Sequence, residues 1–149
     1  LTADCVPILL FEKKRNLIAA IHAGWKGAYK NIIQNVIKLM LRKGCEVNNI
    51  IAAIGPSIQE KNYNVKEDFM RKFIKKYRYS KSFFKKKKGK LYFNLPNFVK
   101  FQLKSNKIRN IDTIKIDTFD KKNNFFSARR SLQLKHDDYG RNISIIMVN

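Results

Sequence analysis

The sequence predicts an α/β (α+β) fold, in which a single domain is built around a central sheet. Segments with the apolar runs typical of strands alternate with segments whose apolar residues recur at helical spacing. The 149 residues have the length of one domain, and 44% of them are hydrophobic, which is enough to build a core without disulfides. No internal repeat or low-complexity linker divides the chain, so we expect residues 1–149 to form one unit.

The first predicted element is a β-hairpin. Residues 6–11 and 17–22 are apolar runs, and a polar stretch over residues 12–16 separates them. A helix should follow, because the next apolar residues recur at helical spacing: Ile32, Ile33, Val36, Ile37, Met40 and Leu41. Basic residues and then Gly44 come directly after this pattern, which is typical of the last turn and C-cap of a helix.

The second half of the chain continues the alternation. Residues 50–54 form a short apolar run that Gly55 and Pro56 end, so they predict a buried strand. Residues 68–79 predict a helix, and residues 91–95 predict a strand. Pro96 then suits the first turn of a helix through Val99 and Leu103. The last predicted strands are residues 111–116 and 143–148.

The chain is strongly basic, with 32 Lys and Arg against 11 Asp and Glu and a net charge of +21. Such a charge would ordinarily suggest an anionic partner. Asn, Ile and Phe are also abundant, and A/T-rich codons encode them as they do Lys, so base composition accounts for much of the charge. The dense run at residues 85–88 sits beside Gly89, as expected of a solvated hairpin tip. No nucleic-acid motif is present, so we expect no specific nucleic-acid partner.

Three further expectations concern membrane partners, the cellular compartment and the completeness of the sequence. The apolar runs are far shorter than the roughly 20 residues that a membrane-spanning helix needs, so we expect no membrane partner. Cys5 and Cys45 follow no disulfide or CxxC pattern, which favours a reducing, cytoplasmic compartment. The sequence opens at Leu1 inside what reads as a strand, which suggests an N-terminal truncation. The oligomeric state is not predicted.

Cys5 and His22 form the first candidate site. If the hairpin turn centres between Lys13 and Lys14, Cys5 lies directly opposite His22, and opposed Cβ atoms are about 4.5–5.5 Å apart. One zinc ion could accept both side chains, because Zn–S and Zn–N bonds are about 2.3 and 2.1 Å long. The same pair could instead act as thiolate and base. A slip of one residue in register would place the two side chains on opposite faces.

Four motifs occur in an order that closely resembles the YfiH-like (laccase-domain) family. They span Thr2 to Pro7 around Cys5, His22 to Gly27, Ile54 to Pro56, and Phe125 to Arg130, with Gly140-Arg141 beyond. The resemblance covers essentially the whole chain. It implies a sheet-centred fold related to that of cysteine hydrolases, with the upstream part of the domain missing here.

The resemblance also implies an enzyme with a metal centre. The family is associated with purine nucleoside phosphorolysis, adenosine deamination and methylthioadenosine phosphorolysis, so purine nucleosides and phosphate are the implied ligands. Its metal, zinc or alternatively copper, is held by one Cys and two His. Cys5 and His22 match two of these ligands and are the implied catalytic residues, while the second His of the family lies upstream of this sequence.

Phosphorolysis further requires an anion pocket, and three residues are candidates for it. Lys26 stands just before a predicted helix, and Arg129-Arg130 form a basic pair. The family usually has Arg at the position of Lys26, and Lys cannot make the same two-pronged contact. We expect Trp25 to be a packing residue and His136 to lie in an exposed loop.

Three other functions compete with this interpretation. The first is copper-dependent phenol oxidation, an earlier label of the family, although two histidines are too few for several copper centres. The second is hydrolysis of peptidoglycan precursors with Cys5 as nucleophile and His22 as base. The third is a basic nucleic-acid-binding module, but the aromatic residues are not interleaved with the charges as a stacking platform requires.

Overall fold

The computed structural model describes residues 1–136 and 138–148. Its main sheet has the order β2-β1-β3-β7 and combines β1 (Val6–Glu12), β2 (Leu17–Ala23), β3 (Ile50–Ile54) and β7 (Asn110–Thr113). The first three strands pair antiparallel, and β7 joins β3 in parallel. The expected sheet-centred mixed α/β domain is therefore confirmed.

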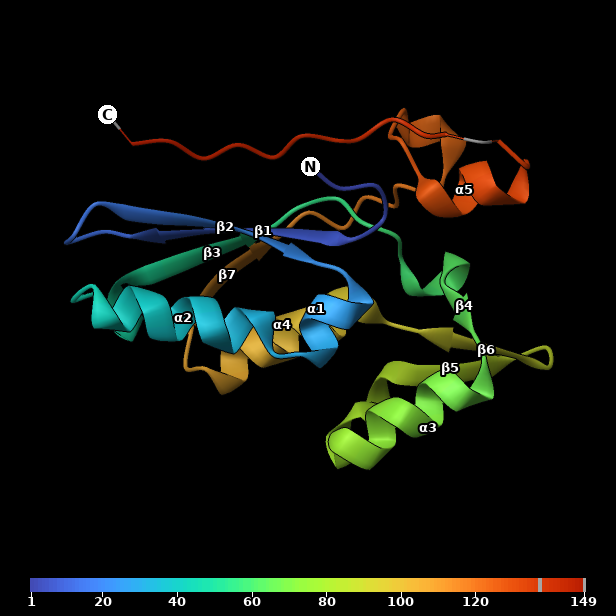
Figure 1. Cartoon of the computed structure of the whole chain (residues 1–149), viewed down its shortest axis with the longest axis horizontal. Coiled ribbons are helices and arrows are strands. Elements are labelled where there is room, and N and C mark those ends of the chain that lie inside the picture. Colours follow the sequence, from blue (N-terminus) through green and yellow to red (C-terminus); the bar gives the residue numbers. More distant parts are fainter. Residues whose placement is uncertain (137, 149) are drawn as a thin grey trace.

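Helices cover one face of this sheet. Figure 1 shows α1 (Trp25–Tyr29), α2 (Ile32–Arg42) and α4 (Leu95–Ser105) below the strands. Alternate residues of β1 point toward these helices, and Val6, Ile8 and Leu10 are fully buried. The core thus lies between the sheet and the helices.

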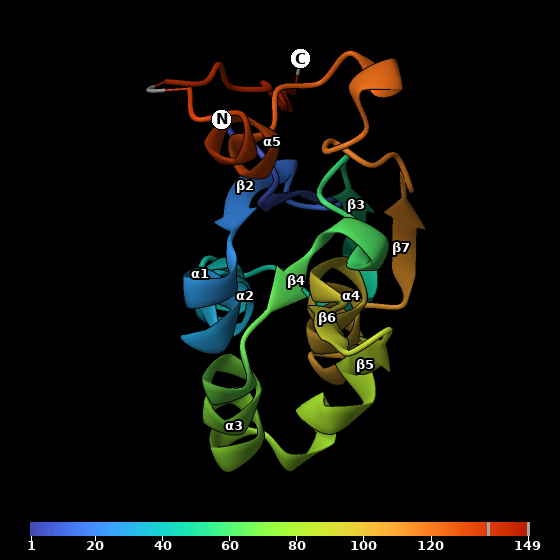
Figure 2. The same cartoon turned by 90° about the vertical axis from the view of Figure 1, so that its right-hand side faces the viewer.

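A second, antiparallel sheet of order β4-β6-β5 forms the other end of the molecule (Figure 2). It consists of β4 (Asn64–Val65), β5 (Phe84–Lys87) and β6 (Lys90–Phe93), and α3 (Glu67–Lys76) packs beside it. Aromatic rings join this sheet to α3 and α4, with centroids 4.6–5.7 Å apart among the closest pairs: Phe69, Phe73, Phe84, Phe93 and Phe98. The remaining elements are η1 (Val47–Asn49), η2 (Glu60–Asn62), η3 (Arg78–Phe83), η4 (Lys121–Asn123) and α5 (Ala128–Gln133).

The hairpin, the first long helix and the third strand are confirmed. α2 ends at Arg42, and Gly44 takes φ +84°, the left-handed conformation that a glycine cap supplies. The Gly44 N–H donates to the Leu41 carbonyl and the Cys45 N–H to the Met40 carbonyl, which is the Schellman pattern.

Three predicted boundaries differ from the structure. The helix predicted over residues 68–79 ends at Lys76 and continues as the 3₁₀ helix η3. The strand predicted over residues 91–95 ends at Phe93, because the Asn94 side chain caps α4 by accepting from the Asn97 N–H at 3.1 Å. β7 stops at Thr113 and does not reach residue 116.

The prediction of a strand over residues 143–148 is wrong. Within the described residues, no strand pairs with residues 143–148. The nearest β-bridge joins the preceding residue, Asn142, to Thr2. This segment runs along the side of the main sheet that the helices leave open (Figure 1), and Ile145 and Met147 are 67% and 78% exposed. An alternating apolar pattern forms a strand only where a neighbouring strand accepts its hydrogen bonds.

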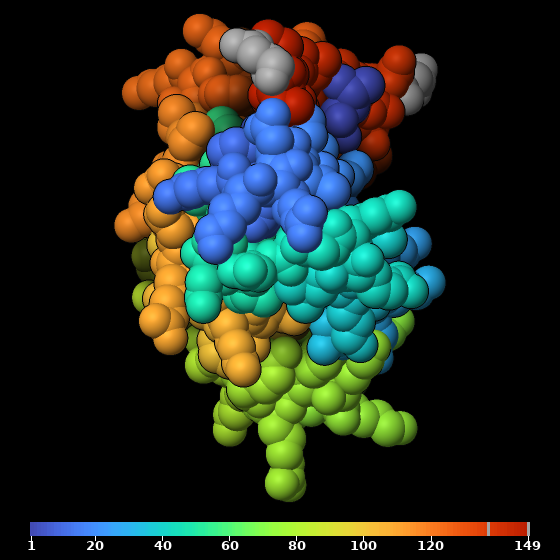
Figure 3. All heavy atoms as spheres, turned by 90° about the vertical axis from the view of Figure 1, so that its left-hand side faces the viewer, coloured from blue at the N-terminus to red at the C-terminus, as the bar shows by residue number. Residues whose placement is uncertain are grey.

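The basic run at residues 85–88 lies in a hairpin, as expected. Three of its lysines are on β5, and Lys88 and Gly89 form the turn with φ of 48° and 73°. Long side chains of the lobe built from α3 and the segment after it project outward in Figure 3. No helix among the described residues is long and apolar enough to cross a membrane.

Candidate active site

The register of the first hairpin differs from the prediction. His22 lies opposite Pro7, and the loop between the strands covers residues 13–16, so the turn centres one residue later than expected. Asn16 takes φ +50° and the Glu12 carboxylate accepts from the Arg15 N–H at 2.6 Å, which fixes this four-residue loop. Moving the turn centre by one residue shifts every pairing partner by two residues. Because side chains alternate between the two faces of a strand, Cys5 and His22 still face the same side of the sheet.

Cys5 and His22 converge on Gly24. Cys5 lies one residue before β1, and His22 is on β2. A Cβ atom at Gly24 would lie 2.8 Å from Cys5 Sγ and 3.9 Å from His22 Nε2. The sulfur and the imidazole nitrogen therefore flank one point and are no farther apart than the sum of these distances. Glycine is required there, because any larger residue would displace the thiol.

The surroundings of the two side chains shift their protonation. Burial, with a smaller contribution from the Asp4 carboxylate, raises the pKa of the Cys5 thiol. Partial burial lowers the pKa of His22. The imidazole is thus neutral near pH 7, the state in which it can act as a metal ligand, while the thiol would have to lose its proton to a metal ion.

Asp4 connects this pair to the last motif of the chain. Its buried carboxylate accepts hydrogen bonds from Thr118 Oγ1 at 2.8 Å, Ser127 Oγ at 3.0 Å and the Arg129 N–H at 2.7 Å. The backbone of Asp4 has φ +80°. Sequence reasoning did not single out Asp4, and only its position beside Cys5 could have indicated this role. Asp4 fixes the start of α5 next to Cys5.

Arg129 projects from the start of α5 into an open cleft of about 550 Å³. Its guanidinium lies 5.2 Å from the centre of the Tyr63 ring, and Nη1 donates to Asn64 O and Oδ1 at 3.0 and 2.8 Å. Burial raises the pKa of Tyr63 to about 12, with the charge of Arg129 opposing and those of Cys5 and Asp4 adding to the effect. Tyr63 thus lies within electrostatic reach of Arg129 and of the segment of residues 1–5 that precedes β1, the Cys5 loop.

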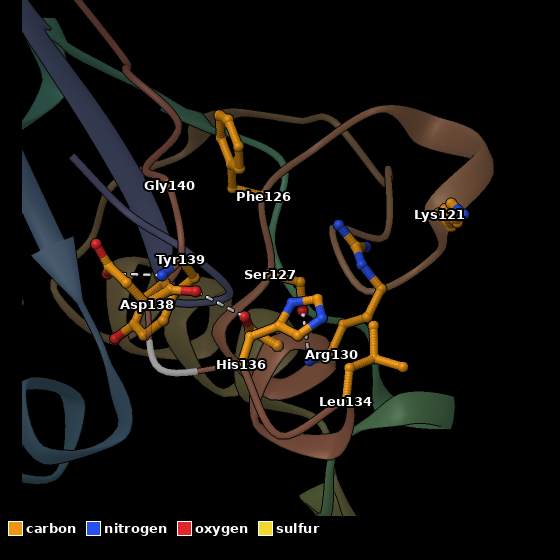
Figure 4. A pocket seen from close by; sticks show the side chains of 10 residues that line it. Lys121, Phe126, Ser127, Arg130, Leu134, His136, Asp138, Tyr139 and Gly140 are labelled. Atoms are coloured by element: carbon orange, nitrogen blue, oxygen red, sulfur yellow. Dashed lines mark hydrogen bonds between the residues drawn. The ribbon is translucent and has the colours of Figure 1, made fainter.

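Arg130 points elsewhere and holds a loop together. It donates to the carbonyls of Thr118 and Phe119 at 2.9 Å and of Phe125 at 2.5 Å. Together with His136, it lines a different hollow of about 380 Å³ around α5 (Figure 4). His136 is exposed, as expected. The structure therefore separates the two arginines, because only Arg129 reaches the cleft beside Tyr63.

Lys26 and Trp25 lie on the short helix α1. Lys26 is exposed, with Nζ 5.6 Å from the centre of the Trp25 ring. Trp25 packs edge-on against Phe69 at 5.2 Å and lines the same cleft as Arg129. The expected packing role of Trp25 is confirmed, although one side of its ring faces the cleft.

The donor set suits part of a metal centre. A thiolate and an imidazole are ligands that zinc and copper accept. Within residues 1–136 and 138–148, however, no group of three His, Cys, Asp or Glu side chains comes together to hold an ion. A catalytic zinc normally has three protein ligands, so Cys5 and His22 alone do not make up such a set.

Known proteins resemble the chain over most of its length. A purine nucleoside phosphorylase of Rickettsia conorii is 38% identical over 144 residues, which are 95% of this chain and 59% of that protein. One of Bacteroides thetaiotaomicron is 34% identical over 99% of this chain and 55% of the relative. An adenosine deaminase, RL5, from an unknown prokaryote is 40% identical over half of this chain. The chain thus spans little more than half the length of the first two.

Solved structures agree with the sequence comparisons. The hypothetical protein YfiH of Bacillus licheniformis superposes with a TM-score of 0.80 at 29% identity, over 88% of this chain and 51% of its own. YlmD of Geobacillus stearothermophilus gives a TM-score of 0.76 at 26% identity, over 88% of this chain and 50% of its own. A family model described as multi-copper polyphenol oxidoreductase laccase matches residues 1–149. The chain therefore belongs to this YfiH-like family.

Proposed function

We propose that the chain is the site-bearing domain of a purine nucleoside phosphorylase that also deaminates adenosine and cleaves methylthioadenosine. The observation that carries the proposal is the position of Arg129, whose guanidinium is held over Tyr63 in an open cleft and whose backbone N–H donates to Asp4, the neighbour of Cys5. The similarity to purine nucleoside phosphorylases along 95% of the chain supports it. The partial similarity to an adenosine deaminase supports the second activity.

Phosphorolysis needs an oxyanion held against a ribose. A phosphate oxygen forms a bond to C1′ while the bond from C1′ to the purine nitrogen breaks, and the departing purine takes up a proton. In this proposal the free guanidinium donors of Arg129 hold the phosphate. Tyr63 also lines the cleft, and its pKa, raised to about 12, keeps its hydroxyl protonated well above neutral pH.

Cys5 and His22 are proposed as two ligands of a metal ion, with a third ligand from outside this sequence. Zinc is the first candidate for the ion, and copper is the alternative. When bound, such an ion would lower the pKa of a water molecule toward 7 and supply the hydroxide for deamination. Within the chain, Gly24 leaves the space in which the two side chains approach each other. Lys26 and Arg130 fit the expected phosphate-binding role less well than Arg129 does. Lys26 is exposed on α1, and the Arg130 guanidinium already binds three carbonyls.

The two rival activities fit the chain less well. The chain has two histidines, and several copper centres would require more. A nucleophilic cysteine works as the thiolate, whereas the surroundings of Cys5 raise its pKa and favour the thiol. Metal content separates the hypotheses: one zinc ion per enzyme supports the proposal, and a metal-free enzyme that alkylation inactivates supports hydrolysis.

Phosphate dependence tests the proposed activity directly. The full-length enzyme should release hypoxanthine from inosine only when phosphate is present. Arg129→Gln should raise the Michaelis constant for phosphate roughly ten- to a hundredfold, because it removes a charge-assisted contact of about 1.5–3 kcal/mol. Arg42→Gln, in the exposed last turn of α2, is the matched control and should leave this constant unchanged. Release of hypoxanthine at an equal rate without phosphate would contradict the proposal.

A further inference from the structure

The cleft at Arg129 carries more positive charge than one arginine. Lys66 and Lys72 line it together with Arg129, and Asp68 is the single acidic residue among the lining side chains given for it. Lys72 comes from the middle of α3 and Arg129 from the start of α5, so elements far apart in the sequence bring these charges together. Sequence reasoning missed Lys66 and Lys72, because they are two of 32 basic residues spread along the chain.

The cations in the cleft are held over aromatic rings. Lys72 Nζ lies 5.5 Å from the centre of the Trp25 ring and 5.2 Å from that of Tyr29, and Arg129 lies 5.2 Å from that of Tyr63. A cation over an aromatic face is held by the ring quadrupole without being neutralised. The aromatic wall of the cleft therefore presents positive charge to a ligand.

The charge of Arg129 is only partly used by the protein. Nη1 binds both oxygens of Asn64, whereas within the described part of the chain neither Nη2 nor Nε donates a hydrogen bond. Salt bridges to Lys66, Lys72 or Arg129 are likewise absent from the described residues. A guanidinium anchored by one nitrogen keeps its other donors available for an oxyanion.

We infer that Arg129, Lys72 and Lys66 form a binding subsite for a phosphate dianion in the cleft between α1, α3 and α5. The inference rests on the proposed function for its place in catalysis, and the binding of phosphate can be measured without catalysis. Asp68 opposes the ligand and limits its affinity.

The test measures the dissociation constant of inorganic phosphate by calorimetry at about 0.15 M salt, where long-range effects of surface charge are screened. Lys72→Gln should weaken binding about three- to tenfold, since Lys72 is exposed, and Arg129→Gln should weaken it more. Lys75→Gln is the matched control, because Lys75 is exposed on the same helix and is not among the residues that line the cleft. Asp68→Asn should tighten binding.

The outcomes separate this inference from the proposed function. Equal weakening in Lys72→Gln and Lys75→Gln, or no weakening in Lys72→Gln, would overturn the subsite. A normal Michaelis constant for phosphate in Lys72→Gln would overturn it while leaving phosphorolysis intact. Phosphate binding that depends on Lys72 in an enzyme without phosphorolysis would support the subsite and refute the proposed function.

A second ligand identifies the source of the phosphate group. If free phosphate is the natural occupant, adenosine 5′-monophosphate should bind no more tightly than phosphate. If a nucleotide is the occupant, adenosine 5′-monophosphate should bind more tightly and show the same dependence on Lys72. Either result supports the subsite, and binding of adenosine 5′-monophosphate that ignores both Lys72 and Arg129 would count against it.

Discussion

At the scale of single residues, Gly24 decides whether Cys5 and His22 can share a ligand. A methyl group at this position would lie 2.8 Å from Cys5 Sγ, closer than such atoms approach in folded proteins. The glycine follows the second strand of a hairpin and precedes a helix, so the backbone there cannot move without shifting one of them. Space for the candidate centre is therefore created by a missing side chain.

We expect Gly24→Ala to lower the free energy of unfolding by about 1–3 kcal/mol, because overpacking forces the thiol or the backbone to move. Urea denaturation measures this change. Gly27→Ala is the matched control in the same motif, since its added methyl group would meet Ile32 at 3.4 Å and the His22 carbonyl at 3.5 Å, which are ordinary contacts. Equal stability of Gly24→Ala and Gly27→Ala would show that the Cys5 loop adapts freely.

The sequence could predict that Cys5 and His22 approach each other, but not how. The apolar runs and the polar stretch between them define the hairpin, and the alternation of side chains defines which face each residue takes. The pairing itself depends on the loop, where Asn16 adopts φ +50° and Glu12 accepts from the Arg15 N–H. No sequence pattern indicates this backbone angle or this hydrogen bond, so the sequence did not define the centre of the turn. The predicted pairing was therefore wrong by two residues.

At the scale of elements, Asp4 joins the start of β1 to the start of α5. These segments are more than 120 residues apart, and the Ser127 and Arg129 donors that Asp4 accepts from lie at the N-terminus of α5. The Ser127 hydroxyl in turn accepts from the Arg130 N–H at 3.1 Å and caps the helix. Asp4 is thus a positioning residue that sets the distance from the Cys5 loop to Arg129.

Two substitutions at Asp4 should separate its hydrogen bonds from its charge. Asp4→Ala leaves buried hydroxyls of Thr118 and Ser127 without an acceptor, and alanine tolerates φ +80° poorly, so we expect a loss of about 3–5 kcal/mol in the free energy of unfolding. Asp4→Asn keeps one oxygen for Ser127 and Arg129, and its amide can donate to Thr118, so the loss should be about 1–2 kcal/mol.

Asp112→Ala, on the exposed surface of β7, is the control for loss of a carboxylate and should change stability by less than about 0.5 kcal/mol. Thermal or urea denaturation of the three variants supplies the measurement. If Asp4→Asn is as unstable as Asp4→Ala, the negative charge rather than the hydrogen bonds holds the two elements together. Sequence patterns could not reveal Asp4 in advance, because such a contact between distant segments leaves no periodic signal.

Predictions at this scale succeeded where the signal is local. The spacing of apolar residues, Pro96 and Gly44 gave α2, α4 and their ends, because caps act within a few residues. The prediction of a strand over residues 143–148 was wrong for the opposite reason. A strand needs a neighbouring strand, and the apolar pattern of a segment does not show whether one is available. The cleft of Arg129 also depends on tertiary placement, because Lys72 reaches it from α3.

At the scale of the whole molecule, helices cover one face of the main sheet and leave the other face open (Figure 1). The side of the main sheet away from the helices carries His22, which is exposed, and the extended C-terminal segment with its exposed apolar residues. The relatives that the chain matches are nearly twice as long as the matched portion. Cys5 and His22 would supply two of the three protein ligands that a catalytic zinc centre normally takes, and the family resemblance implies a third ligand, a histidine, upstream of this sequence.

This arrangement predicts that the 149 residues alone bind zinc weakly and turn over inosine slowly, even when folded. Loss of a residue that only hydrogen-bonds a metal ligand already costs about 10–100-fold in metal affinity, and loss of a residue that binds the metal itself should cost more. His136 could compensate only by leaving the hollow around α5 and moving to Cys5. A polypeptide extended upstream to include the expected histidine should therefore bind zinc more than a hundredfold more tightly, with inosine phosphorolysis restored.

The measurement is a zinc titration against a competing chelator, run side by side with the phosphorolysis assay on both polypeptides. Replacing the upstream histidine by alanine in the longer polypeptide is the matched control, because it keeps the added surface and removes only the ligand. If this variant binds zinc as weakly as the 149 residues do, the histidine is the third ligand. If it binds as tightly as its parent, the added length acts by covering the open face of the sheet, and the centre at Cys5 and His22 takes its third ligand from elsewhere.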